Sequence, residues 1–213
     1  MSLNEQIAKA VIDGDIERVV SLANEVINQG LDINDAIIHG LNAGMKTVSK
    51  FYEKREYYLP EIIISADALY EGLELFKPHL KKSNTTHKAV VVIGVVRGDI
   101  HDIGKNITKL FLEASGYKVI DCGRNVPAEA FIDAIKNNRA EILALSTLMS
   151  PTLESIEELM KKVKEEGLQD KLKIIIGGAA TSEQFAQSIG VIHCDNAAKA
   201  VNVLDELSLG GSE

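Results

Sequence analysis

Apolar residues recur every three or four positions along the first part of the chain, which is the spacing of one face of an α-helix. One such stripe consists of Ile16, Val19, Val20, Ala23, Val26 and Ile27. Further helices are predicted over residues 33–54 and 57–76, and Asp32 or Asn34 would cap the first of these. The pattern over residues 1–82 therefore predicts an antiparallel four-helix bundle.

The pattern changes after the polar stretch KKSNTTHK, which is predicted to be a linker over residues 83–88. Five short runs rich in Val and Ile follow, over residues 88–96, 117–123, 141–147, 171–178 and 190–193. Amphipathic stretches of about 10 to 15 residues alternate with these runs, as in β-α units. We therefore predict an α/β fold, in which a doubly wound, flavodoxin- or Rossmann-like sheet of five parallel strands over residues 89–213 follows the helical bundle.

The composition argues against several classes of protein. The 213 residues have a net charge of −8 and no dense cluster of Lys and Arg, so nucleic-acid binding is disfavoured. No run of about 18 apolar residues could span a membrane, and the N-terminus does not resemble a signal peptide. Cys122 and Cys194 lie outside any CxxC motif, and Cys122 is expected to be a small core residue. We expect a cytoplasmic protein that binds neither nucleic acid nor membranes.

The segments that follow the predicted strands are small, polar or rich in glycine. They read RGDIHDIG, GRNVP, STLMSP, GGAATS and HCDN. In an open parallel sheet ligands bind beyond the carboxyl ends of the strands, so these segments should form one rim for an extended ligand. Polar loops are common at such positions, and only the first segment, with Asp99 two residues before His101, indicates particular chemistry.

Asp99 and His101 have the residue types of a supported metal ligand. A carboxylate bonded to one imidazole nitrogen fixes the tautomer and directs the other nitrogen outward. For an isolated Asp-x-His pair, an Asp cap beside a surface histidine is the alternative. One histidine without a CxxC motif cannot hold zinc, so a metal here should arrive inside a cofactor.

The segment GDIH also resembles the metal-binding segment of metallophosphatases. Those sites need further clusters of His and Asp. The other histidines, none of which lies in such a cluster, are His39, His79, His87 and His193. We therefore reject that class.

Three short motifs occupy three of the loops. Asp-x-His-x-x-Gly covers residues 99–104, Ser-x-Leu covers 146–148 and a glycine pair covers 177–178, with 41 and 28 residues between them. In order and spacing they resemble the signature of the cobalamin-binding family, which includes methionine synthase and the corrinoid proteins of methyltransferase systems. Residues 43–69, with Leu-Pro-Glu at 59–61, are similar to the helical cap domain of that family. The resemblance therefore covers essentially the whole chain.

The resemblance implies a cobalamin or related corrinoid as cofactor. His101 would be the lower axial ligand of cobalt, in place of the cofactor's own base. Asp99 would hydrogen-bond His101, and the hydroxyl of Thr152 would complete that relay, so these three residues would act in catalysis. The remaining residues placed beside the cofactor by the first motif are Asp102, Ile103 and Gly104.

Further roles implied by the resemblance concern the two ends of the cofactor. Ser146 would bond the displaced nucleotide tail. The slot for this tail would be lined by Leu148, Gly177 and Gly178. Tyr52, where the family often has Phe, and Leu59 would shield the upper cobalt position. The last loop, GVIHCDNA, lacks the tyrosine that the family often carries there.

The function implied by this resemblance is transfer of a methyl group on cobalt. Cob(I)alamin would accept the methyl group from a substrate-specific methyltransferase, and methylcobalamin would pass it to a second methyltransferase, with tetrahydrofolate or another one-carbon carrier as acceptor. A reductive activating protein would restore the cofactor. The chain would thus be a methyl carrier without turnover of its own, and its cap would swing away at the linker to admit each partner.

Two alternatives stay open, namely a cobalamin-binding sensor or regulator and the small subunit of an adenosylcobalamin mutase. The acidic charge disfavours a DNA-binding regulator, and the Leu-Pro-Glu cap disfavours the mutase subunit. The sequence leaves open the methyl donor, which could be a methoxylated aromatic, a methylamine, methanol or a betaine. The oligomeric state and the lower base of the corrinoid also stay open.

Overall fold

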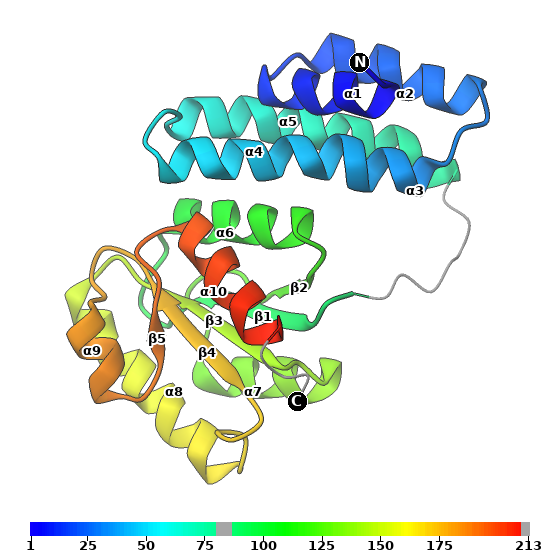
Figure 1. Ribbon diagram of the computed structural model, residues 1–213. Helices are drawn as coiled ribbons and strands as arrows, with labels where there is room; N and C mark the ends of the chain where they lie inside the picture. The colour runs from blue at the N-terminus through cyan, green and yellow to red at the C-terminus, as the bar shows by residue number, and fades with distance from the viewer. Residues whose placement is uncertain (80–86, 210–213) are drawn as a thin grey trace. The chain divides into compact units, whose positions relative to one another are not determined.

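The computed structural model describes residues 1–79 and 87–209. The chain divides into two compact units, Met1–Thr86 and His87–Glu213, which we call the helical unit and the sheet unit (Figure 1). Residues 83–86 of the predicted linker lie outside the described residues. Among the described residues, no helix is long and apolar enough to cross a membrane.

The helical unit is a bundle, and its first three helices begin at side-chain caps. Its elements are α1 (Leu3–Ile12), α2 (Ile16–Asn28), α3 (Ile33–Asp35), the π-helix η1 (Ala36–Leu41), α4 (Asn42–Glu53), α5 (Leu59–Phe76) and the 3-10 helix η2 (Lys77–His79). The side chains of Ser2, Asp15 and Asp32 accept backbone N–H bonds at the starts of α1, α2 and α3. The predicted stripe of α2 is largely correct, because Val19, Ala23 and Val26 are buried, but Ile16 in its first turn is exposed.

Glycines allow two helices of this bundle to pack closely. The segments α3, η1 and α4 form one continuous helical rod, and α1 packs along it. A β-carbon on Gly44 would stand 2.8 Å from Cβ of Val11, and one on Gly40 would stand 3.0 Å from Cγ2 of Ile7. Both distances are too short for ordinary contact, so larger residues at 40 or 44 would push α1 away from the rod.

The sheet unit is a doubly wound fold with five parallel strands, as predicted. Its elements are β1 (Val90–Val95), α6 (Ile103–Ala114), β2 (Lys118–Asp121), α7 (Ala128–Asn138), β3 (Ile142–Ser146), the 3-10 helix η3 (Ser150–Thr152), α8 (Leu153–Glu165), β4 (Lys173–Gly177), α9 (Glu183–Ser188), β5 (Ile192–His193) and α10 (Ala197–Leu209). The strand order is β2-β1-β3-β4-β5. Helices α6 and α10 cover one face of the sheet, and α7, α8 and α9 cover the other (Figure 1).

The two faces of the sheet bury alternate residues of each strand. On β1, Val92 packs into the core under α7 and α8, while Val91 and Ile93 are buried toward the opposite face. The topological switch point of the sheet lies between β1 and β3, because the chain adds β2 on one side of β1 and adds β3, β4 and β5 on the other. The register of these two parallel strands pairs Val95 with Ser146. In this fold the crevice at that switch point is where ligands bind, and the loops after β1 and β3 open there.

A candidate corrinoid site at the switch point of the sheet

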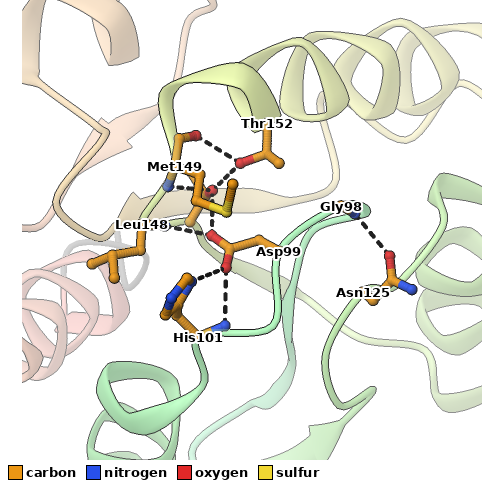
Figure 2. A network of polar contacts seen from close by, with 8 residues as sticks. Gly98, Asp99, His101, Asn125, Leu148, Met149 and Thr152 are labelled. Carbon is orange, nitrogen blue, oxygen red and sulfur yellow. Dashed lines mark hydrogen bonds and ion pairs between the residues drawn. The ribbon is translucent and has the colours of Figure 1, made fainter.

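The loop after β1 places a buried carboxylate against a half-exposed imidazole. Asp99 is completely buried, whereas the side chain of His101 is 49% exposed. Oδ1 of Asp99 accepts the backbone N–H of His101 at 2.9 Å and lies 2.7 Å from its Nδ1 (Figure 2). The turn itself is held by Asn125, whose Oδ1 accepts the N–H of Gly98 and whose N–H donates to the carbonyl of Asp99.

The loop after β3 supplies the partners of the second carboxylate oxygen. Oδ2 of Asp99 accepts the hydroxyl of Thr147 at 2.8 Å and the backbone N–H of Leu148 at 2.6 Å. The hydroxyl of Thr147 also contacts that of Thr152, which is bonded to the carbonyl of Met149 at 2.7 Å (Figure 2). The predicted relay residue Thr152 therefore lies one hydrogen bond farther from Asp99 than Thr147 does.

These contacts determine the charge of Asp99. Burial by itself raises the pKa of this carboxyl, but the N–H groups of His101 and Leu148, the hydroxyl of Thr147 and the imidazole together hold it well below its ordinary value. An ionised carboxylate only accepts hydrogen bonds, so Nδ1 of His101 must carry the proton. Nε2 then presents a lone pair, the form of imidazole that binds metals.

The surface around His101 fits a large, flat and mostly apolar ring. Four apolar side chains near it in sequence or in space are unusually exposed, namely Ile100, Ile103, Leu148 and Met149. A β-carbon on Gly104, in the first turn of α6, would meet nothing within 4 Å. An exposed apolar patch around an outward-facing imidazole is typical of a binding site. The residues present therefore fit a corrin ring over His101.

Among the described residues, no group of three or more His, Cys, Asp and Glu side chains is arranged to hold a metal ion. His101 can thus offer cobalt a single protein ligand, and the other ligands would belong to the corrinoid itself. Asp102 is the N-cap residue of α6 but accepts no cap bond through its side chain. Asp102 is half-buried.

The glycine pair after β4 packs against protein backbone. A β-carbon on Gly177 would stand 2.8 Å from the carbonyl oxygen of Cys194, and one on Gly178 would overlap the carbonyl of Thr147. Ser146 ends β3 beside Gly177 and is half-buried. Ser146 and the glycine pair thus lie together at the carboxyl end of the sheet, and neighbouring backbone leaves no room for a β-carbon at either glycine.

Other predicted residues lie elsewhere. Tyr52 is half-buried on α4 and Leu59, at the start of α5, is 36% exposed, and both belong to the helical unit. In the last loop, Nε2 of His193 lies 3.1 Å from the hydroxyl of Thr181. Cys194 is buried, and burial raises the pKa of its thiol to about 11. This thiol is therefore protonated at neutral pH and unsuited to bind a metal.

The sequence analysis missed Thr147 and Asn125, which bond the Asp99 loop, and the exposed apolar residues Ile100 and Met149. Thr147 stands at the unspecified position of Ser-x-Leu, and Asn125 lies in a loop with no motif. One signal could have pointed to Thr147. It is a hydroxyl residue directly after the buried strand β3, and β3 is the neighbour of β1, whose following loop carries Asp99.

Comparisons with known proteins show which proteins this chain is similar to. Two families, both described as B12 binding domain, match residues 89–202 and 3–77. Trimethylamine corrinoid protein 1 of Methanosarcina acetivorans is 37% identical over 194 residues, 89% of this chain and 90% of that protein. A corrinoid protein of Desulfitobacterium hafniense is 37% identical over 193 residues, 89% of each chain.

A solved structure extends the similarity to three dimensions. A chain in the crystal structure of the methanol:cobalamin methyltransferase complex MtaBC from Methanosarcina barkeri superposes with a TM-score of 0.88 and 33% identity. The superposition covers 99% of this chain and 81% of that chain. The chain therefore belongs to the B12-binding corrinoid proteins of methyltransferase systems, and its cofactor is cobalamin or a related corrinoid.

Proposed function

We propose that this chain carries a methyl group between two methyltransferases, one specific for the methyl donor and one for the acceptor. The bound corrinoid supplies the chemistry, because its cobalt can accept a methyl group and release it again. The observation that supports this role is the half-exposed His101, bonded to a buried carboxylate and surrounded by exposed apolar side chains. The relatives named as trimethylamine, dimethylamine and methanol system proteins support the same role.

In this proposal the residues of the site orient the cofactor from below. His101 is the lower ligand of cobalt through Nε2, while Asp99 keeps the proton on Nδ1. Ser146 and the glycine pair would hold the nucleotide tail of the cofactor. Thr152 supports Asp99 through Thr147.

The upper side of the cofactor has to be both protected and accessible. Tyr52 and Leu59 in the helical unit shield it, and the unit moves aside when a partner enzyme binds. If the two units are cross-linked in the shielding position, methyl transfer should stop, while the corrinoid stays bound. Full transfer by the cross-linked protein would contradict this movement.

The nature of the partners follows from the same proposal. The donor is a methylamine or methanol in the first instance, as in the systems of the named relatives, and the acceptor is tetrahydrofolate or another one-carbon carrier. A reductive activating protein is a third partner. Cobalt(I) that is oxidised to cobalt(II) can no longer accept a methyl cation, so the activating protein has to return the missing electron. Partner choice belongs to the methyltransferases and not to the site around His101.

The first test is cofactor binding with and without His101. The protein is loaded with hydroxocobalamin, desalted, and its visible spectrum is compared with that of His101→Ala. We expect stoichiometric retention and a base-off, His-on spectrum that is lost in the variant. An unchanged spectrum in His101→Ala would contradict the assignment of the lower ligand.

The second test is transfer. The loaded and reduced protein is mixed with methyltransferases for trimethylamine, dimethylamine and methanol, each with its substrate, and methylation is followed by the visible spectrum. Methylation by at least one enzyme is expected. Tight corrinoid binding without methylation by any of them would contradict a methylamine or methanol donor and would leave methoxylated aromatics, betaines and the sensor alternative.

A further inference from the structure

Thr147 connects the three motifs of the site, although no motif specifies it. Its hydroxyl donates to Asp99 at 2.8 Å, its backbone N–H donates to the carbonyl of Gly177 at 3.1 Å, and its own carbonyl packs on Gly178. The side chain is completely buried. A buried hydroxyl with this many contacts is held in one orientation.

The protons of this cluster can be assigned by counting donors. The hydroxyl of Thr147 donates to Oδ2 of Asp99 at 2.8 Å, so its single proton points to that oxygen. The hydroxyl of Thr152 donates its one proton to the carbonyl of Met149 at 2.7 Å, and its oxygen contacts the hydroxyl of Thr147. That carbonyl also accepts the backbone N–H of Thr152 at 3.1 Å. The hydroxyl of Thr147 is therefore directed to Asp99, and Thr152 reaches the carboxylate only through Thr147.

This direction has a consequence for the imidazole. Thr147 and Leu148 restrain Oδ2, and a carboxylate restrained at one oxygen cannot rotate the other away from its partner. Oδ1 therefore stays in line with Nδ1 of His101. Without the Thr147 hydroxyl, only the N–H of Leu148 would restrain Oδ2.

We propose that Thr147 is a positioning residue that sets how completely His101 ligates the cobalt of the bound corrinoid. The proposal rests on the proposed role of His101 as lower ligand. Thr147 does not touch the cofactor in this account and acts only through Asp99. Loss of such a supporting bond commonly weakens a metal site by about 10- to 100-fold.

The test compares Thr147→Val, which keeps the shape and removes the hydroxyl, with Thr147→Ser, which keeps the hydroxyl. Each protein is made with histidine isotopically labelled at the ring nitrogens, loaded, and reduced to the cobalt(II) state. Electron paramagnetic resonance then reports the labelled nitrogen as a splitting of the cobalt lines. We expect full histidine ligation in the natural protein and in Thr147→Ser. Thr147→Val should show a reduced histidine-ligated fraction and about 10-fold weaker corrinoid binding or more.

Controls separate this proposal from the one on which it rests. If His101→Ala keeps the labelled splitting, the lower ligand itself is wrong. If His101→Ala loses it and Thr147→Val keeps both the splitting and the affinity, only the role of Thr147 is overturned. Circular dichroism checks folding, and Thr147→Ala, which is smaller than threonine and cannot clash, replaces the valine variant if that protein is unfolded.

Discussion

The carbonyl oxygen of Thr147 lies where the β-carbon of any larger residue at Gly178 would have to be. Gly178 also has a φ angle of +111°, in the region that favours glycine. The loops after β3 and β4 can therefore approach each other only through a glycine. That approach holds the Thr147 backbone at the carboxyl end of β3, where its hydroxyl donates to Asp99.

Replacing this glycine should damage the fold before it affects the cofactor. In Gly178→Ala the added methyl group meets the Thr147 backbone, and the backbone at 178 is strained as well. We expect the sheet unit to lose about 2 kcal/mol or more of stability, and the corrinoid site to loosen with it. Urea unfolding of the apoprotein measures this loss. Unchanged stability would show that the loop can shift without cost.

Gly104→Ala is the matched counterpart. A methyl group there enters open space, and alanine favours a helix over glycine, so the apoprotein should be as stable as the natural protein or more stable by up to about 1 kcal/mol. Because the proposed corrin ring lies over this first turn of α6, corrinoid binding should fall by about 10-fold. Equal affinity in Gly104→Ala and the natural protein would mean that the ring does not approach residue 104.

The sequence pattern predicted the architecture because both halves follow simple periods. Runs of Val and Ile bounded by polar loops identify buried parallel strands, and the order of five strands leaves few ways to wind the sheet. The contact between Asp99 and His101 could also be predicted from the sequence, because two residues so close in one loop can interact independently of the rest of the fold. Local chemistry and regular periods are what a single sequence reveals.

Contacts between distant segments were beyond that reasoning. Thr147 and Asp99 meet only because β1 and β3 are neighbours in the sheet, which brings together loops that are 48 residues apart in sequence. Lys105 is 3% exposed on α6, although lysine is ordinarily a surface residue. Its burial depends on Asp121 at the end of β2, whose position no helical or strand period indicates.

Leu59 tests the proposed shielding of the upper side of the cofactor. It is 36% exposed in the helical unit, so Leu59→Ala should cost the apoprotein less than about 1 kcal/mol. In the loaded protein the same change should speed the exchange of the upper cobalt ligand for added cyanide several-fold. Leu31→Ala removes another exposed leucine of the same unit and should leave the exchange rate as it was. Equal rates in all three proteins would contradict the shielding role of Leu59.

Lys105 and Asp121 form an ion pair that links the first turn of α6 to β2, and the lysine of this pair is buried. The ammonium of Lys105 lies 2.7 and 2.6 Å from the two carboxylate oxygens. Lys105→Met would leave the carboxylate of Asp121, whose side chain is 21% exposed, with only Lys109 and the N–H of Gly123, and we expect a loss of about 1–3 kcal/mol. Lys109→Met is the control, because Lys109 lies 3.3 Å from Asp121 and is 31% exposed, and it should cost at most about 1 kcal/mol. Similar losses in the two variants would show that the buried position of Lys105 carries no special weight.

The same pair should make the stability of the sheet unit depend on pH. Burial raises the pKa of Asp121, but the ammonium of Lys105, the N–H of Gly123 and the nearby Lys109 lower it more, so the net shift is downward. A carboxyl whose folded pKa lies below its unfolded value stabilises the fold above about pH 4, and this stabilisation disappears as the pH falls through the folded pKa.

Removing the lysine should therefore matter less in acid. In Lys105→Met the burial of Asp121 remains while its main counter-charge is gone, so the folded protein accepts a proton on Asp121 more readily than the natural protein does. The difference in unfolding free energy between the two proteins should be largest near neutral pH and should shrink below about pH 4. Urea unfolding from about pH 7 to about pH 3 measures it. Lys136→Met removes the lysine of an exposed ion pair with Glu166 and should show hardly any such change. A difference between Lys105→Met and the natural protein that stays constant with pH would mean that Asp121 is not stabilised as an anion by Lys105.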